Sequence, residues 1–200
     1  MVNIFCISAM QGSDANGPLG LLVCLFIGLA IGAANAFGVL FLKIAPFVMT
    51  LCTTTICEGI CYVYTQGSPT GSAAPFIRAL GTGRLFGSPF STLIWLALAA
   101  AMWVVLRFTA LGRRLYAVGG SEQSAAMMGL DVKKTKLKAY VLSSFLCSVG
   151  GICYCMNTMS ASVSQATGME MDAISSAVIG GTLLTGGVGN VIGTLFGVLI

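Results

Sequence analysis

Long apolar runs alternate with short polar stretches along the chain. The runs at 19–42 and 90–107 are almost wholly apolar, and those at roughly 45–65 and 137–157 follow the same pattern. A helix needs about 20 mostly apolar residues to cross a bilayer. The pattern therefore predicts four membrane-spanning helices, the second of which begins at Pro46, a residue favoured in the first helical turn.

Two shorter apolar runs follow near the C-terminal end. The run at 173–185 is too short to cross as a straight helix, so we expect it to be tilted, re-entrant or joined to part of the preceding loop. Broken helices at membrane depth occur where protein or a water-filled cavity covers their backbone, as in transporters. With the last run, which reaches Ile200, about six membrane-embedded segments are predicted, in an all-α, polytopic helical bundle.

The composition agrees with a membrane protein. Only 8% of the residues are charged, 56% are hydrophobic and the mean hydropathy is +0.94. So few charged residues cannot cover the surface of a soluble protein. Seven of the ten Lys and Arg residues lie in 107–138, which predicts that this segment faces the cytoplasm and that 66–89 and 158–172 lie outside. Interleaved aromatic residues are missing there, so we expect an anionic lipid surface and no nucleic acid as its neighbour. The first basic residue, Lys43, comes too late for a signal peptide.

Several kinds of chemistry are excluded by the residue types. The chain has no histidine, which removes Ser–His and Cys–His catalysis, histidine-ligated haem and HExxH zinc sites. No Gly-Lys pair occurs, so a Walker A loop is absent. Cys57 and Cys61 are one helical turn apart, but structural zinc needs four ligands and we expect no metal site. "GTGRLFG" and "GVGNVIG" have the wrong spacing for dinucleotide binding.

The charged segment contains one short predicted helix, within "GGSEQSAAMMGLDVKK". Ser121 is a good N-cap, Glu122 complements the positive helix end and Gly129 is a natural stop, so 122–128 is predicted to form two turns. Such a helix is unstable alone in water and must pack on a surface. It either rests on its own protein or on lipid headgroups, or it docks on a cytoplasmic partner through its small and adaptable centre. That centre consists of Ala125, Ala126, Met127 and Met128.

Polar residues in the second predicted span form the candidate solute path. Thr50, Thr54 and Glu58 share one helix face, because they are spaced four residues apart. With Gln66 they would line a polar path, although the hydroxyls could equally bond carbonyls of their own helix. A carboxylate at mid-bilayer faces a cavity or a partner, which would place Glu58 on the solute path. Alternatively, Glu58 lies near the outer interface, or it is neutral and bonded to a neighbouring helix, and then it has no role in the path.

Roles are also predicted for three further sets of residues. Asn35, within the first span, either bonds a neighbouring helix or lines the path. Asp172 is predicted to be the N-cap of a helix starting at Ala173, and with Glu170 it would lie at the outer mouth of the path. A close-packing face between membrane helices is predicted from glycines at four-residue spacing, Gly189, Gly193 and Gly197.

A family resemblance rests on four stretches in one order. "GRRLYAVGGSEQSAAMMGLDVKKTKLKAY" resembles the cytoplasmic loop of ABC-transporter permeases of the ribose/xylose/galactose type, with its pattern G-R-x-x-Y-A-x-G-G-N followed by A-A-x-x-x-G-I-x-V. "IGAANAFGVLFLKIAPFVMTL", "TQGSPT" and "GMEMDAISSAVIGGTLLTGGVGNVIGTLFGVLI" resemble the family's other motifs. The likeness runs from about residue 18 to the end of the sequence.

The resemblance implies a non-catalytic permease subunit of a cell-membrane importer that moves a monosaccharide by alternating access. Its partners would be a separate ATPase that binds ATP and Mg²⁺, an extracytoplasmic solute-binding protein and a second permease subunit, identical or different, while this chain carries no cofactor. Residues 1–200 would be one transmembrane domain, incomplete at both ends relative to the family, with a coupling loop at 108–136. The residues implied in coupling are Ser121, Glu122, Ser124, Ala125, Ala126, Met127 and Gly129.

Departures from the family pattern leave alternatives open. Ser121 stands where the family usually has Asn, Ala36 replaces a Gly, and Glu58 stands where a basic residue is more common. A permease for branched-chain amino acids is one alternative. An ATPase-independent channel or secondary transporter is another, with Glu58 as its ion-coupling group. A non-transporting fragment is the third, because spans before residue 18 and an end beyond Ile200 are expected in the family.

Overall fold

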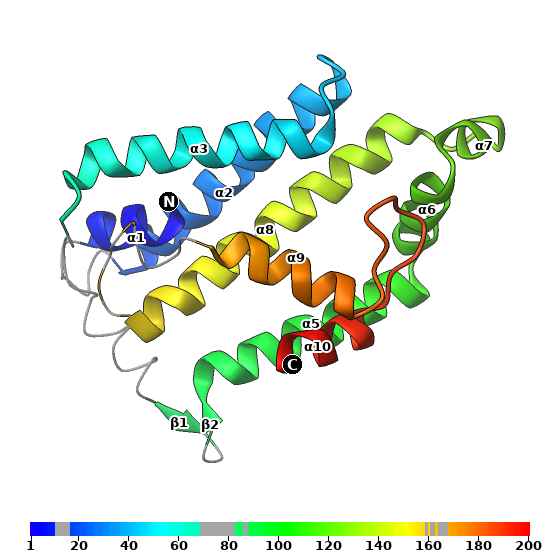
Figure 1. Cartoon of the computed structure of the whole chain (residues 1–200). Helices are drawn as coiled ribbons and strands as arrows, with labels where there is room; N and C mark the ends of the chain where they lie inside the picture. Colours follow the sequence, from blue (N-terminus) through cyan, green and yellow to red (C-terminus); the bar gives the residue numbers. More distant parts are fainter. Residues whose placement is uncertain (11–16, 69–82, 86–87, 159, 161–162, 164–167) are drawn as a thin grey trace. The chain divides into compact units, whose positions relative to one another are not determined.

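The computed structural model describes residues 1–10, 17–68, 83–85, 88–158, 160, 163 and 168–200. Within these residues the chain is built of helices, with one short antiparallel strand pair (Figure 1). In order, the elements are α1 (Val2–Met10), α2 (Gly17–Leu40), α3 (Pro46–Thr65), β1 (Arg84–Leu85), β2 (Ser88–Pro89), α5 (Phe90–Phe108), α6 (Ala110–Gly120), α7 (Glu122–Met127), α8 (Val132–Thr158), α9 (Met169–Ile179) and α10 (Val191–Leu199).

The four predicted spans are confirmed as helices. Within the described residues, α2, α3, α5 and α8 are long and apolar enough to cross a membrane. The helix α8 begins five residues earlier than the apolar pattern predicted, because Asp131 accepts a hydrogen bond from the backbone N–H of Lys134 at 3.1 Å and so starts the helix within its charged residues. The all-α class is confirmed. With 11 and 9 residues, α9 and α10 are each too short to cross as straight helices.

The chain forms two compact units. One comprises Met1–Trp95 and Tyr140–Ala166, and the other comprises Leu96–Ala139 and Thr167–Ile200. Two of the long helices, α5 and α8, contribute residues to both units.

Small residues let α2 and α8 pack closely in the first unit. Gly28 faces Ser148, and Gly32 faces Ser144 one turn further along. A Cβ atom at either glycine would overlap the serine hydroxyl opposite it, so only glycine fits both positions. Membrane helices associate by close packing of this kind, because an apolar side chain gains nothing from exchanging lipid contacts for protein contacts.

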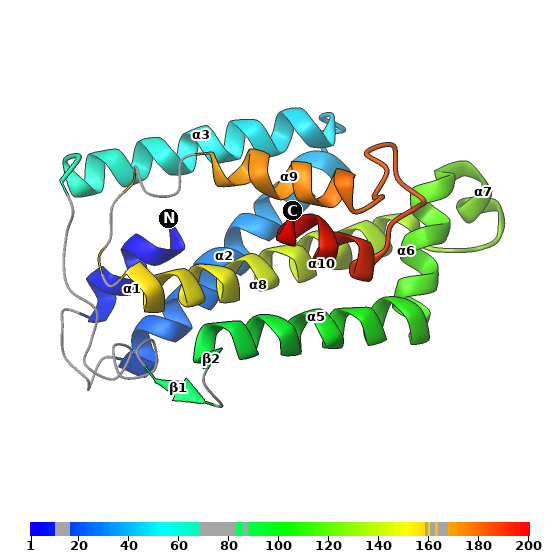
Figure 2. The same ribbon diagram turned by 60° about the horizontal axis from the view of Figure 1, so that its bottom comes forward.

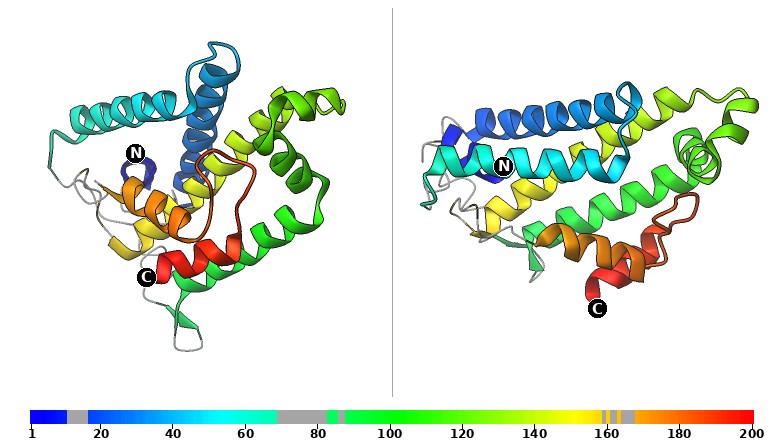
Figure 3. Two further views of the ribbon diagram at one scale, coloured as in Figure 1. Left: turned by 45° about the vertical axis from the view of Figure 1, so that its right-hand side comes forward. Right: turned by 45° about the horizontal axis from the view of Figure 1, so that its top comes forward.

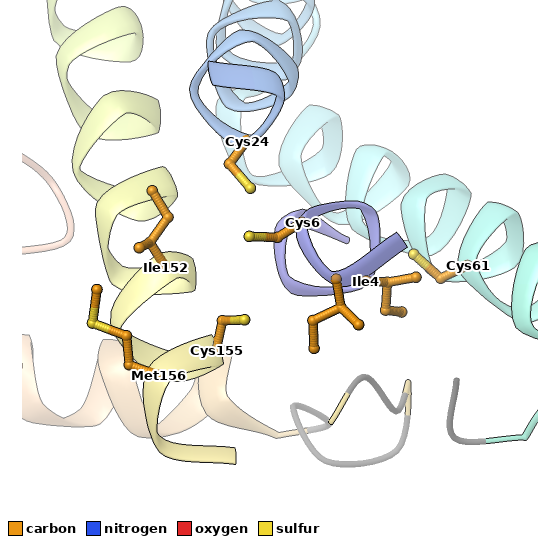
Figure 4. Packing of buried hydrophobic residues seen from close by; sticks show 8 residues of the cluster. Ile4, Cys6, Cys24, Cys61, Ile152, Cys155 and Met156 are labelled. Carbon is orange, nitrogen blue, oxygen red and sulfur yellow. The ribbon is translucent and has the colours of Figure 1, made fainter. Parts of the chain in front are cut away.

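The helix α1 inserts beside α2 and α8 and completes the buried cluster of the first unit. Its residues Ile4, Cys6 and Ile7 are at most 3% exposed. The thiols of Cys6, Cys24 and Cys155 point toward one another from α1, α2 and α8 (Figure 4). These buried cysteines fill the place of small hydrophobic side chains.

Glycines also let α9 and α10 pack side by side in the second unit (Figure 3). A Cβ atom at Gly193 would overlap the carbonyl of Gly180, and one at Gly197 would overlap the carbonyl of Ser176. The predicted close-packing face is therefore confirmed at Gly193 and Gly197. The third predicted member, Gly189, lies before α10, where its nearest neighbour is the side chain of Thr182.

The prediction that Asp172 is an N-cap is wrong. Gly168 takes the cap position with φ of 94°, a left-handed conformation that glycine adopts without strain, and α9 begins at Met169. Asp172 therefore lies within the first turn of the helix, together with Glu170. There the two carboxylates complement the positive end of the helix dipole instead of capping it.

Candidate functional site

The charged loop holds the predicted short helix, α7, with both of its predicted end signals. The hydroxyl oxygen of Ser121 accepts a hydrogen bond from the backbone N–H of Ser124 at 3.2 Å, which caps the N-terminus. At the other end Gly129 has φ of 79°, and its N–H donates to the carbonyl of Ala126 at 3.0 Å. The next N–H, of Leu130, donates to Ala125 at 3.1 Å, so the last carbonyls of the helix are satisfied.

The two alanines of α7 have different environments. Ala125 is 0% exposed, whereas Ala126 is exposed. Met127 and Met128, which follow, are 87% and 67% exposed. One alanine therefore packs on this protein, and an open face of one alanine and two methionines remains. Exposed adaptable side chains of this kind suit a docking surface.

An ion pair fixes α7 to the first turns of α8. The ammonium of Lys136 forms a short ion pair with the carboxylate of Glu122, the first residue of α7. The side chain of Lys136 is 28% exposed and that of Glu122 is 57% exposed, so the pair is only partly shielded from solvent. The helix α7 is thus held at its start by a cap and by a charge contact. In Figure 3 it lies at the turn between α6 and α8.

A contact between glycines supports the base of α7, and we call it the glycine contact. It joins Gly119 and Gly120, at the end of α6, to Gly186 and Gly187 in the loop between α9 and α10 (Figure 2). A Cβ atom at Gly119 would lie 2.8 Å from the backbone nitrogen of Gly187, which leaves no room for a side chain.

A hydrogen bond accompanies the glycine contact. The hydroxyl of Tyr116 donates to the carbonyl of Gly189 at 2.9 Å. Both α6 and this contact were missed by the sequence analysis. The signals in the sequence were Thr109, the N-cap of α6, and the Gly-Gly pairs at 119–120 and 186–187.

The start of α8 closes a pocket against α6. The pocket has a volume of about 270 Å³. Asp131 is engaged there, because its carboxylate pairs with the ammonium of Lys134 at 3.0 Å. The backbone N–H of Lys134 and then its ammonium lower the pKa of Asp131, since both stabilise the ionised form. We call this the basic pocket; its lining residues are Ala110, Leu111, Arg114, Asp131, Lys134, Thr135 and Lys138.

The residues predicted to line a solute path are arranged along α3. The hydroxyls of Thr50 and Thr54 donate to carbonyls of their own helix, at 3.1 Å to Pro46 and 3.0 Å to Thr50. Glu58 is exposed on α3 and has no ion-pair partner in the part of the chain that the structure describes. Both threonines therefore bond carbonyls of their own helix, which is one of the two alternatives predicted from the sequence.

Asn35 makes the interhelical bond that its position in a span suggested. The hydroxyl of Thr53, on α3, donates to the side-chain oxygen of Asn35, on α2, at 2.6 Å. Among the described residues, no hydrogen bond joins Asn35 to Thr50, Thr54 or Glu58. The structure therefore places Asn35 at the contact of α2 with α3 and the other three residues along one helix.

The remaining predicted site lies at the start of α9, where Glu170 and Asp172 are both exposed. The preceding loop, from 159 to 167, falls largely outside the described residues, as do the last two residues of the "TQGSPT" motif. Within the described residues no group of three or more His, Cys, Asp or Glu side chains is placed to hold a metal ion.

Comparison with known proteins adds one family and several relatives. A family model described as branched-chain amino acid transport system / permease component matches residues 3–200. The ribose import permease protein RbsC of Escherichia coli K12 is 36% identical over 197 residues, which cover 96% of this chain and 61% of that protein.

Two further relatives extend the comparison. The RbsC protein of Bacillus subtilis is 38% identical over 160 residues, covering 79% of this chain and 50% of that protein. The fructose import permease protein FruG of Bifidobacterium longum is 32% identical over 214 residues, covering 100% of this chain and 62% of that protein. The chain thus spans between a half and about three fifths of the length of these relatives. No solved structure matches it significantly.

Proposed function

The chain belongs to the family of branched-chain amino acid transport system permease components, and from this premise we propose that it is the membrane-spanning subunit of a binding-protein-dependent ABC importer for a monosaccharide. It is a multi-pass membrane protein and a transport subunit, without a catalytic role of its own. In this proposal ATP and Mg²⁺ are bound by a partner ATPase, a solute-binding protein delivers the sugar outside, and a second permease subunit completes the pore.

The open face of α7 carries this proposal. A helix of six residues in a cytoplasmic loop has no intrinsic stability, yet here it is capped, ion-paired and seated by Ala125. Ala126, Met127 and Met128 stay exposed beside it. A rigid helix that presents adaptable apolar side chains fits a cleft on a cytoplasmic partner, which is the role of a coupling helix.

Closure of the ATPase would move α7, and the contacts of α7 determine which other elements move with it. The ion pair of Glu122 with Lys136 leads to α8. The glycine contact and the bond of Tyr116 to Gly189 lead to the loop between α9 and α10. Both routes end at membrane-embedded segments, so a displacement of α7 would tilt these segments as alternating access requires.

A monosaccharide is preferred as the solute because of the relatives. The family description names branched-chain amino acids, whereas the relatives described above are ribose and fructose import permeases. The polar residues of α3 also suit a sugar. A threonine hydroxyl that donates to its own helix still has lone pairs that accept from a sugar hydroxyl, so Thr50 and Thr54 stay usable acceptors. The carboxylate of Glu58 would accept further hydrogen bonds from sugar hydroxyls on the same face.

The test of the coupling role is a tagged pull-down from the native membrane followed by mass spectrometry. We compare the wild type with Ala126→Trp, which puts a bulky ring on the open face of α7. The matched control is Ala173→Trp, the same change at an exposed alanine of α9. We expect a P-loop ATPase with the wild type and with Ala173→Trp, and a loss of at least tenfold with Ala126→Trp.

Absence of an ATPase from all three samples would reject the importer assignment. Uptake that survives loss of the ATPase but is abolished by Glu58→Gln would indicate a secondary transporter instead. The solute class is tested separately, by competition of uptake with ribose, fructose and leucine. Competition by leucine alone would replace the sugar with a branched-chain amino acid.

A further inference from the structure

The basic pocket gathers cations from two helices around one cavity. Arg114 comes from the second turn of α6, and Lys134 and Lys138 come from the first turns of α8. Asp131 is the only carboxylate in the lining, and its partner is Lys134. Arg114 and Lys138 have neither an ion pair nor a hydrogen bond in the part of the chain that the structure describes. The lining thus keeps two uncompensated positive charges.

The pocket also has an apolar wall and lies next to the membrane-spanning helices. Ala110 and Leu111 form this wall, two to three residues after α5 ends at Phe108. On the other side, the apolar part of α8 begins directly after Lys138. If the positive charges of 107–138 mark the cytoplasmic side, the pocket lies at the height of the inner headgroups.

We propose that the basic pocket binds the phosphate of an anionic phospholipid headgroup at the cytoplasmic membrane surface. Arg114 and Lys138 supply the charges that a phosphodiester needs, and Lys134 adds hydrogen-bond donors beside them. A volume of about 270 Å³ leaves space for a phosphate and part of its glycerol, which would lie against Ala110 and Leu111. Basic pockets at the cytoplasmic ends of membrane helices bind lipid headgroups in this way. The inference rests on the membrane orientation and not on the transported solute.

The chain offers a control of equal charge for this proposal. Arg113 and Lys133 are exposed, lie on the same two helices, and are immediate neighbours of Arg114 and Lys134, but neither lines the pocket. R114Q/K138Q and R113Q/K133Q remove the same charge, one from the pocket and one beside it. R114K/K138R keeps the charge and tests whether the double change is tolerated by the fold.

The measurement is native mass spectrometry of the detergent-purified protein with its partner subunits. It is titrated with phosphatidylglycerol, phosphatidylcholine or inorganic phosphate. We expect wild type, R113Q/K133Q and R114K/K138R to bind one phosphatidylglycerol in preference to phosphatidylcholine. R114Q/K138Q should bind it about 30-fold more weakly, since each charge near a lipid surface contributes roughly fivefold.

Three results would overturn the proposal. Equal losses in R114Q/K138Q and R113Q/K133Q would mean general surface charge and no defined pocket. Displacement of phosphatidylglycerol by millimolar inorganic phosphate would indicate a site for a soluble anion. Unchanged lipid binding by R114Q/K138Q, together with loss of the ATPase from the purified complex, would indicate a contact with that subunit instead.

Discussion

Two adjacent glycines of the glycine contact, Gly119 and Gly120, differ in the space that each leaves for a side chain. A Cβ atom at Gly119 would lie 2.8 Å from the backbone of Gly187, whereas one at Gly120 would meet nothing within 4 Å. We expect Gly119→Ala to displace the loop of Gly187 and to destabilise the protein by about 1–3 kcal/mol, as overpacking does. Gly120→Ala should be neutral or slightly stabilising, because alanine favours the helix.

Thermal unfolding of the purified protein, followed by tryptophan fluorescence, measures both glycine variants. Uptake is measured beside it, since the glycine contact connects α6 to the loop between α9 and α10. A fall in uptake for Gly119→Ala at temperatures well below its unfolding would show that the contact serves transport as well as stability. Equal behaviour of the two variants would contradict the packing described for Gly119.

The bond from Thr53 to Asn35 is a second test at the scale of single residues. Thr53→Val keeps the shape of the side chain but leaves the Asn35 oxygen without its donor at the contact of α2 with α3. Hydrogen bonds between membrane helices contribute on average about 0.6 kcal/mol and at most about 1.7 kcal/mol. We therefore expect a small but measurable fall in unfolding temperature. Thr55→Val is the control, because that hydroxyl bonds only to Leu51 of its own helix, and an equal fall there would contradict the interhelical role.

At the scale of elements, α7 depends on its ends because it is so short. Ser121→Ala removes the side-chain acceptor that caps the N–H of Ser124, a change that costs about 1 kcal/mol in other helices. We expect faster hydrogen exchange in 122–128 and weaker ATPase binding, with little change in global unfolding. Ser124→Ala, which leaves the backbone N–H in place, is the control.

Ser121→Asn provides the rescue for the same helix. Asparagine is as good an N-cap as serine, and it stands at this position in the permease pattern that the charged loop resembles. Exchange protection and ATPase binding should therefore match the wild type. If Ser121→Asn behaved like Ser121→Ala, the hydroxyl itself and not the cap would be the functional feature.

The sequence predicted the elements that a single local signal defines. Long apolar runs located α2, α3, α5 and α8, and one serine and one glycine located the ends of α7. Elements stabilised by distant contacts were missed. The helix α1 is buried by residues of α2 and α8. The helix α6 is held by a hydrogen bond from Tyr116 to Gly189, which is 73 residues away in the sequence. Asp172 was misplaced because a left-handed glycine, Gly168, starts α9 earlier than its apolar run.

The candidate site was predicted to a similar extent. The helix of the charged loop could be proposed because capping is local chemistry. Its two faces could not, since only the packed chain distinguishes buried Ala125 from exposed Ala126. The basic pocket needs the return of α8 toward α6, which no local pattern reports. The carbonyls that accept from the hydroxyls of Thr50 and Thr54 are also known only from the folded helix.

At the scale of the whole molecule, α8, which is long and apolar enough to span a membrane, lies between the charged loop and α9. If α8 crosses the membrane once, Met127 on α7 and Met171 on α9 must face opposite sides. Both methionines are exposed, at 87% and 55%. Met127→Cys and Met171→Cys therefore form a matched pair for labelling with a membrane-impermeant maleimide, after subtraction of the wild-type signal from the native cysteines.

We expect Met127→Cys to be labelled only in inverted vesicles and Met171→Cys only in right-side-out vesicles, because the positive charges of 107–138 hold their loop inside. Addition of the ATPase should then protect Met127→Cys from labelling and leave Met171→Cys unchanged, since a docked subunit covers only α7. Labelling of both cysteines from one side would show that α8 does not cross. Labelling of Met127→Cys from outside would remove α7 from the reach of any cytoplasmic motor, and the coupling role with it.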